Sequence, residues 1–391
     1  MDVTLVLTHD CNLGCGYCYA GRKFRKSMPR DVMVKALDLA FSDGDTGKIQ
    51  VSFFGGEPTL EWGLLVAAAE HARSLAGARH LVQCVTTNGT LLTAERVDRL
   101  AKLDIYVGFS IDGNQRAHEA NRPSMNGQST WASVSKGLDL MIDAGRAFET
   151  ISVVTPASVR ELGASVDELF ARGVPRVALN PCYESVWSDD DLAHWERGLI
   201  EAAGTVARHM RAGRVVSLNV FDAKIIARIK GGLDEGDKCD LGGAFIAVAP
   251  SGHLYPCERL VGEDTDEAAR IGHVSTGIER SRVTGFRAEN LPEWHAQNEE
   301  CGGCAEQVRC SNHCACANRA ETGNYGIAGG VQCWHEQTTA RKADELADTL
   351  FAEGNDAFKR WFFPHGQVPV PTAIAATTRV PREKRALRVL R

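Results

Sequence analysis

Three cysteines near the start of the chain, Cys11, Cys15 and Cys18, stand in the spacing C-x3-C-x2-C. Three thiolates on one short loop can hold three corners of a cubane iron–sulfur cluster. Because no fourth cysteine lies nearby, the fourth iron would be open to a ligand from outside the protein. An open coordination position distinguishes a catalytic metal site from a closed structural one. The alternative is a zinc site that a distant residue completes, although zinc sites more often use C-x2-C pairs.

The chain has 13 cysteines in 391 residues, and most of the others form a second group far along the sequence. An odd total fits a closed set of disulfides poorly, and clustered thiols in a reducing compartment are typical of metal sites. Outside both groups, Cys84 is expected to be a buried strand residue, whereas Cys182 is expected to face the site. We therefore interpret both groups as metal ligands. The members of the second group are Cys239, Cys257, Cys301, Cys304, Cys310, Cys314, Cys316 and Cys333.

The elements that must position these thiols alternate between short β-rich runs and amphipathic stretches up to about residue 235. This alternation predicts parallel strands joined by right-handed crossovers. Six units are too few for a closed eight-stranded barrel, which leaves a partial barrel or an open doubly wound sheet. Strands are predicted at Val3–Leu7, Ile49–Phe54, Leu81–Thr86, Tyr106–Ser110, Thr150–Thr155 and Arg176–Leu179. Helices are predicted near 30–42, 59–76, 93–103, 129–144, 158–172 and 190–213, with Thr93 and Ser188 as caps of two of them.

Unusual polar, cysteine-rich or glycine-rich segments follow five of these predicted strands. In a partial barrel and in an open parallel sheet alike, reactive groups gather at the carboxyl ends of the strands. We therefore expect the five segments to surround one cleft. They are Cys11–Cys18, Gly55–Pro58, Thr87–Gly89, Ile111–Gly113 and Asn180–Cys182.

After residue 235 the helical periodicity fades, and glycine, cysteine and turn signals dominate. A hairpin is predicted to turn at Pro250–Gly252, and residues 336–362 are predicted to be helical. We expect three parts: residues 1–235, the cysteine-rich residues 236–345, and a C-terminal helix with a basic tail over residues 346–391.

The composition is that of an ordinary globular protein, with 44% hydrophobic and 24% charged residues and a net charge of −6. It excludes a mostly disordered chain and a generally basic nucleic-acid binder. The start of the chain has no secretory signal, and no apolar run has the ~18 residues needed to span a bilayer. The sequence thus predicts a cytoplasmic protein that binds neither nucleic acid nor membrane.

The first cysteine motif, with an aromatic residue before its third cysteine, resembles that of radical S-adenosylmethionine (SAM) enzymes. The resemblance implies a partial (β/α)6 TIM-like barrel, a [4Fe–4S] cluster whose open iron binds SAM, and reductive cleavage of SAM to a 5′-deoxyadenosyl radical. The GGEP element at Gly55–Pro58 would contact the SAM amino group, the SIDG motif would lie near the ribose, and Arg122 would neutralise the carboxylate. The residues that the resemblance assigns to SAM binding are Tyr17, Gly55, Gly56, Glu57, Asn88, Ser110, Asp112 and Arg122.

The second cysteine group resembles the SPASM domain, a C-terminal module that carries two auxiliary [4Fe–4S] clusters. By that resemblance, Cys301, Cys304, Cys310 and Cys333 would hold one cluster, and Cys239, Cys257 and Cys314 the other. Some relatives supply a fourth ligand six residues after the first cysteine, where this chain has Phe245. The site either keeps an open iron for substrate or is completed by Cys316. A pair of structural zinc sites is the alternative for the whole module.

Known SPASM proteins mostly modify peptides or proteins, so the resemblance implies oxidative cross-linking, by a thioether or carbon–carbon bond, of a ribosomally made peptide. A reductant such as flavodoxin or ferredoxin would supply electrons. Because the motif begins at residue 11, a separate protein is expected to bind any leader peptide, which the basic tail could also attract.

Three alternatives stay open. The first is anaerobic sulfatase maturation, which generates formylglycine. There the relatives place an aspartate after the cysteine equivalent to Cys257, whereas this chain has Glu258, a conceivable base. The others are a small-molecule dehydrogenase of the same superfamily and a non-catalytic iron–sulfur electron carrier.

Overall fold

The computed structural model describes the chain except residues 43–46, 238, 240, 291–298, 312–313 and 365–391. Among the described residues, eleven strands form one sheet in the order β11-β10-β9-β8-β1-β2-β3-β4-β5-β6-β7. The strands β1 to β7 are all parallel, as the alternation of strands and helices predicts. Their bounds are β1 Asp2–Thr8, β2 Lys48–Gly55, β3 His80–Thr87, β4 Ile105–Ser110, β5 Phe148–Val154, β6 Arg176–Pro181 and β7 Ser217–Leu218.

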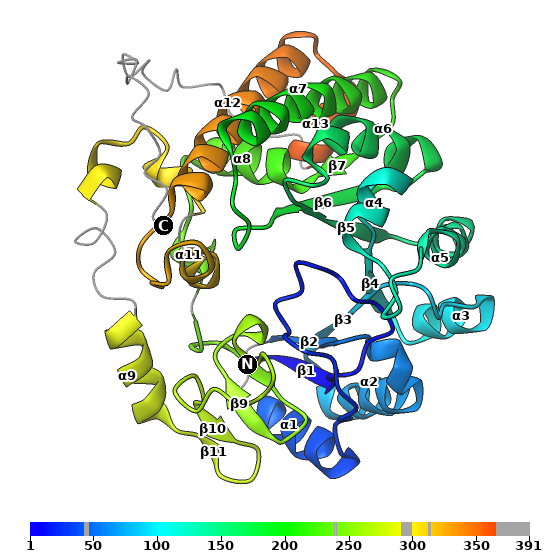
Figure 1. Cartoon of the computed structure of the whole chain (residues 1–391), viewed down its shortest axis with the longest axis vertical. Coiled ribbons are helices and arrows are strands. Elements are labelled where there is room, and N and C mark those ends of the chain that lie inside the picture. Colours follow the sequence, from blue (N-terminus) through cyan, green and yellow to red (C-terminus); the bar gives the residue numbers. More distant parts are fainter. Residues whose placement is uncertain (43–46, 238, 240, 291–298, 312–313, 365–391) are drawn as a thin grey trace.

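All six predicted strands are confirmed, and the short β7 adds a seventh parallel strand. Strand β1 lies between β2 and β8 and is buried on both faces, which explains its unbroken run of β-branched and apolar residues. Figure 1 shows the sheet curving, with α2, α3 and α5 on its outer side and α7, α8 and α12 beyond β6.

The helices of the first part match the predicted ranges, and the two predicted caps are confirmed. Thr93 accepts a hydrogen bond from the Arg96 amide, and Ser188 forms a reciprocal capping box with Asp191. The structure adds two helices that the periodicity did not predict, α4 and α8. The bounds are α1 Arg30–Ser42, α2 Trp62–Ala76, α3 Ala94–Lys102, α4 Gln115–Asn121, α5 Trp131–Asp143, α6 Leu162–Arg172, α7 Asp189–Arg211 and α8 Asn219–Lys230.

The hairpin predicted at Pro250–Gly252 is confirmed as the turn between β8 (Phe245–Val248) and β9 (His253–Tyr255), with Gly252 at φ +92°. Because β8 pairs in parallel with β1, one sheet continues across the boundary expected at residue 235. It ends in β10 (Gly272–His273) and β11 (Gly277–Ile278).

The cysteine-rich part continues through α9 (Arg280–Asn290) and α11 (Ala315–Thr322) into the longer α12 (Gly330–Ala352). The helix predicted over 336–362 is wrong in its bounds. Helix α12 begins six residues earlier and ends before Gly354, whose φ of +67° breaks the helix, and α13 (Asp356–Phe362) follows with Asn355 as its cap. The boundary expected at residue 345 therefore falls within α12. The basic tail lies outside the described residues.

Candidate active site

The first cysteine loop is held to the end of β2 by an unusually close approach of two backbones. The Gly56 amide donates to the Thr8 carbonyl at 2.8 Å, and the Glu57 amide donates to the Asp10 carbonyl at 2.9 Å. A Cβ atom at Gly56 would lie 2.1 Å from the Asp10 carbonyl oxygen, and one at Gly55 would lie 2.4 Å from that of Thr8. Only glycine permits this contact, so the Gly-Gly pair fixes where the cysteine loop begins.

The far side of the loop is held by the segment that follows α4. The Gly14 amide donates to the Pro123 carbonyl at 2.8 Å, and the Gly16 amide donates to the Asn121 carbonyl at 3.1 Å. Leu13, between Asn12 and Gly14, is buried and forms a β-bridge with Ser124. Main-chain bonds therefore hold the loop at both ends and leave its thiols free to face the interior of the molecule.

The thiols of this loop line a cavity of about 570 Å³ that the strand ends surround. The structure confirms the expected convergence for the segments after β1, β2, β3 and β6, whereas β4 reaches the cavity with its last residue, Ser110, and Ile111–Gly113 does not line it. Residues of the first part of the chain form one part of the lining, the first wall, and residues of the second part, including Glu258 and Cys314, form another, the second wall. The predicted site residues that line it are Cys11, Cys15, Tyr17, Cys18, Gly55, Gly56, Glu57, Asn88, Ser110, Arg122, Cys182, Glu258 and Cys314.

The carboxylate of Glu57 is used inside the protein. It accepts hydrogen bonds from the hydroxyl of Thr87 at 2.7 Å and from the backbone amides of Thr59 at 3.0 Å and Asn88 at 2.7 Å. Burial raises the pKa of Glu57, although these hydrogen bonds by themselves lower it. The side chain thus ties the loop after β2 to the loop after β3.

Asn88 supports the cysteine loop from the end of β3. Its side-chain amide donates to the side-chain oxygen of Asn12 at 2.9 Å, and its own oxygen accepts from the Thr90 hydroxyl at 2.7 Å. Asn12 in turn donates to Thr90 at 2.8 Å. Asn88 therefore helps to orient the loop between Cys11 and Leu13.

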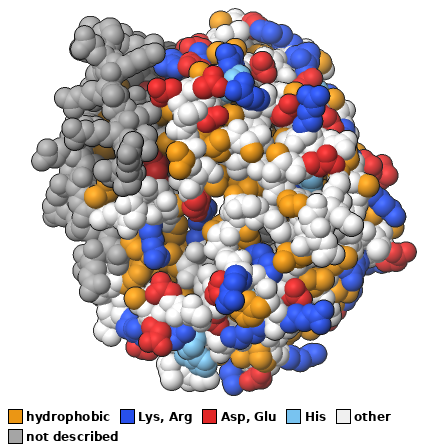
Figure 2. All heavy atoms as spheres, in the orientation of Figure 1, with side chains coloured by type: hydrophobic (Ala, Val, Ile, Leu, Met, Phe, Trp, Pro, Cys, Tyr) orange, Lys and Arg blue, Asp and Glu red, His pale blue; other side chains and the backbone are white. Residues whose placement is uncertain are grey.

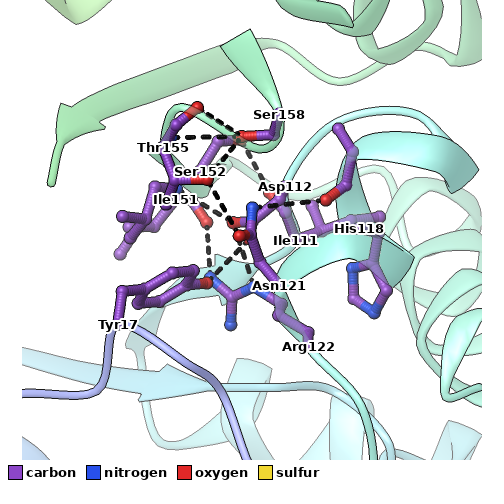
Figure 3. A network of polar contacts seen from close by, with 12 residues as sticks. Tyr17, Ile111, Asp112, His118, Asn121, Arg122, Ile151, Ser152, Thr155 and Ser158 are labelled. Carbon is purple, nitrogen blue, oxygen red and sulfur yellow. Dashed lines mark hydrogen bonds and ion pairs between the residues drawn. The ribbon is translucent and has the colours of Figure 1, made fainter. Parts of the chain in front are cut away.

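Asp112 lies behind the cavity wall and orients two residues that form that wall (Figure 3). It pairs with Arg122 (Nε to Oδ1, 3.0 Å) and accepts from the Tyr17 hydroxyl at 2.8 Å. The Arg122 guanidinium lies over the Tyr17 ring, 5.3 Å from its centre. Burial opposes the charge of Arg122, but the neighbouring Asp112 carboxylate more than offsets it and raises the pKa of Arg122. A permanent cation is therefore held at the cavity wall.

Cys11 and Cys15 need a positively charged group beside them to lose their protons. Burial raises the pKa of Cys11 to about 12 and also raises that of Cys15, while the ammonium of Lys23 donates to the Cys18 sulfur at 2.8 Å. Thiolates bind metals only when deprotonated. Among the residues that the structure describes, no three Cys, His, Asp or Glu side chains converge as ligands of a single ion. Cys11, Cys15 and Cys18 line one cavity, so this donor set fits three protein ligands of a [4Fe–4S] cluster.

Several thiols of the second group influence one another. Cys316 and burial raise the pKa of the Cys257 thiol, and burial, with Cys239 and Cys257, raises the pKa of Cys314. Cys316 is buried, at 6% exposure, at the start of α11. The grouping of Cys239, Cys257 and Cys314 as ligands of one cluster stays a prediction.

A buried ion pair positions the loop that carries Cys310. Lys224 of α8 pairs with Glu336 of α12 at 2.5 Å and donates to the Arg309 carbonyl at 3.0 Å. The amide and the hydroxyl of Ser311 each donate to Glu336 at 2.6 Å. Burial disfavours the charge of Glu336, but Lys224 outweighs it and lowers the pKa of this carboxyl. Because α12 also carries Cys333, the pair joins the segments of two predicted ligands. Neither residue was predicted, since no local pattern reveals a pair 112 positions apart.

Arg259 was also missed, although it follows the predicted Glu258 directly. It ion-pairs with Glu184, beyond β6, at 2.5 Å and lies over the Tyr19 ring at 4.5 Å. All three residues line the cavity, as does Glu258. Arg259 thus joins the two walls of the site.

Comparisons with known proteins agree with this geometry. Residues 5–169 match the model of the Radical SAM superfamily. An uncharacterized protein of Methanocaldococcus jannaschii is 31% identical over 45% of this chain, but the match spans only 60% of that protein. The serine-type anaerobic sulfatase-maturating enzyme of Klebsiella aerogenes is 24% identical over 82% of this chain and 80% of its own length. The PqqA peptide cyclase of Streptomyces rochei is 25% identical over 93% of this chain and 96% of its own.

A solved structure described as native anSMEcpe with bound AdoMet has the same fold, with a TM-score of 0.75 at 19% identity. The match covers 89% of this chain and 98% of that one.

Residues 5–169 thus form a radical SAM domain, and the chain is a radical SAM enzyme. A [4Fe–4S] cluster and SAM, the cofactors of that superfamily, are its cofactors, and the electron-carrier alternative is set aside. Among the described residues, no helix is long and apolar enough to cross a membrane. The face of the molecule in Figure 2 shows basic and acidic side chains interspersed, without a continuous basic surface.

Proposed function

We propose that this enzyme oxidises a ribosomally made peptide and closes a thioether or carbon–carbon cross-link within it. One observation carries the proposal: a single cavity of about 570 Å³ has the SAM-binding thiols on one wall and Glu258 with Cys314 on the other. A peptide segment held between these walls would lie within reach of both. The near full-length likeness to a peptide cyclase supports this substrate class.

In this proposal the residues of the first wall bind and orient SAM. Cys11, Cys15 and Cys18 hold the cluster, and the backbone of Gly55 and Gly56 faces the amino group. Arg122, kept charged by Asp112, neutralises the carboxylate. Tyr17 holds Arg122 from the loop itself, and Ser110, also on the wall, lies on the ribose side. Because the whole wall is fixed by buried hydrogen bonds, the substrate C–H can be aligned while competing donors are kept out.

The second wall completes the oxidation. We assign Cys301, Cys304, Cys310 and Cys333 to one auxiliary [4Fe–4S] cluster, and Cys239, Cys257 and Cys314 to the other. When bound, SAM and its reduced cluster would supply hydrogen-atom abstraction from the peptide, and an auxiliary cluster would supply the acceptor for the remaining electron. Glu258 takes the proton, since its carboxylate lines the cavity and lies 3.6 Å from the Cys257 sulfur. A reductant such as flavodoxin or ferredoxin would supply the electron for the SAM cluster.

Sulfatase maturation is the second candidate. Several relatives carry that name, and two of them align over 82% of this chain. The two reactions share the oxidation but differ in the product, since a sulfatase peptide would gain an aldehyde and a cross-linked peptide would not.

The test uses anaerobically reconstituted enzyme, SAM, a reductant and the peptide encoded beside the gene. We expect 5′-deoxyadenosine and a peptide that has lost two hydrogens, with no fragmentation between the linked residues in tandem mass spectrometry. Cys15→Ala should abolish both products, a larger loss than the ~10–100-fold typical of removing an outer partner of a metal site. Cys84→Ser is the control and should retain both products. The Cys84 thiol does not line the cavity, and its sulfur lies 3.0 Å from the Ser52 hydroxyl.

A hydrazine-reactive aldehyde on a sulfatase peptide, with no change in the encoded peptide, would replace the proposal with the second candidate. SAM cleavage without a mass change in either peptide would contradict both and favour a small-molecule substrate. Glu258→Gln should then separate the steps: SAM cleavage should continue, while peptide oxidation should fall by ~10²-fold or more.

A further inference from the structure

We propose that the side-chain amide of Gln332 binds a main-chain amide of the substrate, so that the cavity recognises a stretch of peptide backbone. This inference deepens the proposed function and rests on it, because it names the part of the peptide that the second wall of the cavity holds. Gln332 lies in the first turn of α12 and belongs to none of the motifs that indicate SAM or cluster binding.

One face of α12 is polar although it is buried. Four polar side chains stand at positions i, i+3, i+4 and i+7, which places them on one side of the helix. All four line the cavity, and none is more than 6% exposed. Because a buried polar group is costly unless it is hydrogen-bonded, each needs a partner in the protein or in a ligand. The four are Gln332, His335, Glu336 and Thr339.

Three of the four have partners within the protein. Glu336 pairs with the Lys224 ammonium at 2.5 Å and accepts a hydrogen bond from the Ser311 hydroxyl at 2.6 Å. The Thr339 hydroxyl lies 3.3 Å from Nδ1 of His335. The opposite charges of Lys224 and Glu336 cancel, so the pair offers no unbalanced charge to an ionic ligand. A neutral polar group therefore suits this part of the cavity.

Gln332 is the exception on this face. It is 2% exposed, and its side-chain oxygen has no hydrogen-bond partner among the residues that the structure describes. Its backbone is satisfied, because the Gln332 amide donates to the Glu321 carboxylate at 3.0 Å. Within the described ranges, no other buried side-chain acceptor that lacks a partner lines the cavity. The unmet hydrogen bond indicates a group that the cavity receives from outside the protein.

The chemistry of the glutamine side chain indicates what that group is. A primary amide presents one acceptor and two donors, whereas a carboxylate only accepts and an ammonium only donates. An amide of the substrate matches this pattern, because it offers an N–H to the oxygen and a C=O to the nitrogen. A carboxamide side chain has the same chemistry as the main chain, and the experiment separates these two sources.

The position of Gln332 explains what such a contact does. Gln332 is on the second wall together with Glu258, and the thiols that hold the SAM cluster are on the first wall. A backbone held at the second wall fixes which side chain of the peptide faces SAM. Gln332 is thus a positioning residue, and its contact places the reacting C–H rather than activating it.

The test uses the reconstituted enzyme with SAM and a probe that has main-chain amides but no side chains, acetyl-triglycine N-methylamide. Saturation-transfer NMR measures its Kd. We expect binding to the parent and a Kd about tenfold weaker for Gln332→Leu, which keeps the bulk of the side chain and removes its hydrogen bonds. The urea midpoint of Gln332→Leu should not fall, because no hydrogen bond within the protein is lost.

Gln83→Leu is the matched control. Gln83 of β3 is also buried with an unpartnered oxygen, but its side-chain nitrogen donates to the Leu103 carbonyl at 3.0 Å and it does not line the cavity. The same substitution there should leave the Kd of the probe unchanged and should lower the urea midpoint, because it removes a hydrogen bond that the folded protein makes.

Several outcomes would overturn the inference. They are a parent enzyme that does not bind the probe, an unchanged Kd for Gln332→Leu, and tighter binding of propionamide, which would assign the site to a carboxamide side chain. A changed iron content or EPR spectrum in Gln332→Leu would instead assign the amide to the cluster expected at Cys333. If circular dichroism shows that the leucine variant does not fold, Gln332→Met is measured in its place. Because the probe is not the natural peptide, failure of the peptide assay with normal binding of the probe would contradict the proposed reaction but not this inference.

Discussion

The thiols of the two cysteine regions are placed by different parts of the protein. In the first region, residues 11–18 are clamped by main-chain hydrogen bonds to the ends of β1 and β2 and to the segment after α4. In the second region, the assigned ligands extend from residue 239 to residue 333, and side chains join their segments, chiefly through the Lys224–Glu336 pair.

The two regions are therefore expected to tolerate different substitutions. A loop held by its backbone is insensitive to most side-chain changes but intolerant of added bulk at a close approach. A region held by buried charged side chains depends on each partner, because a lone buried charge is costly. Substitutions at the kind of contact that holds each region should therefore have the largest effect there.

The largest effect on stability is expected in the second region, from Glu336→Gln. The change leaves the Lys224 ammonium buried beside a neutral amide, and we expect a loss of about 3–5 kcal/mol in the free energy of unfolding. Urea unfolding followed by circular dichroism measures it. Replacing both members by methionine should cost less than Glu336→Gln alone, because no charge is left unpaired.

The matched control is Glu353→Gln, at the exposed ion pair with Arg211. It should leave the urea midpoint unchanged, because solvent and salt screen such pairs. If Glu336→Gln and Glu353→Gln behave alike, the buried pair does not hold the second region, and the comparison between the two regions fails.

In the first region, Gly56→Ala should be harmful although it adds only a methyl group. The new Cβ would meet the Asp10 carbonyl oxygen 2.1 Å away, and neither backbone can move without displacing the cysteine loop. We expect a loss of about 1–3 kcal/mol in stability together with less iron in the SAM cluster, measured by urea unfolding and iron analysis. A variant with normal stability and iron content would show that the close approach is not what holds the loop.

Gly63→Ala offers a control of identical chemistry. Gly63 lies on the exposed side of α2, and a Cβ there would meet nothing within 4 Å. Because alanine restricts the unfolded chain and favours helix, this change should stabilise the protein by about 0.5–1 kcal/mol.

The same contrast explains what the sequence could predict. The six strands, the caps at Thr93 and Ser188, and the convergence of five strand ends follow from local patterns and from the geometry of parallel sheets. The partnership of Lys224 with Glu336 does not, because it joins two helices far apart in the sequence, one of which, α8, was not predicted. The inward use of the Glu57 carboxylate was missed for a similar reason, since its donors come partly from another loop. The start of α12 at Gly330 was missed because glycine is a weak helix former.

The last prediction concerns the pH dependence of stability, and it compares a group of α4, the helix before the segment that holds the first region, with one that contacts the C-terminal helix α13. His118 of α4 is fully buried, its Nε2 lies 3.0 Å from the Thr130 hydroxyl, and burial, with Arg122 nearby, lowers its pKa from 6.5 to about 3. Below pH ~6.5 the unfolded chain therefore binds a proton at His118, whereas the folded protein does not. The free energy of unfolding accordingly decreases as the pH falls. Asp222 of α8, which accepts from the Trp361 indole at 2.9 Å, has the opposite sign. Burial raises its pKa from 3.8 to about 6, so the folded protein takes up the proton first and gains stability as the pH falls through ~6.

Between pH ~7.5 and ~5.5 each group should change the free energy of unfolding by about 1 kcal/mol, and the two contributions should nearly cancel. Single variants remove one contribution at a time, so only the change between the two pH values matters, whatever each variant costs at neutral pH. His118→Asn should make the protein gain stability on acidification relative to the parent, and Asp222→Asn should make it lose stability. Urea midpoints of the three proteins at both pH values measure this difference. If both variants keep the parent's pH response, neither burial controls the protonation of its group, and the pH dependence must originate elsewhere in the chain.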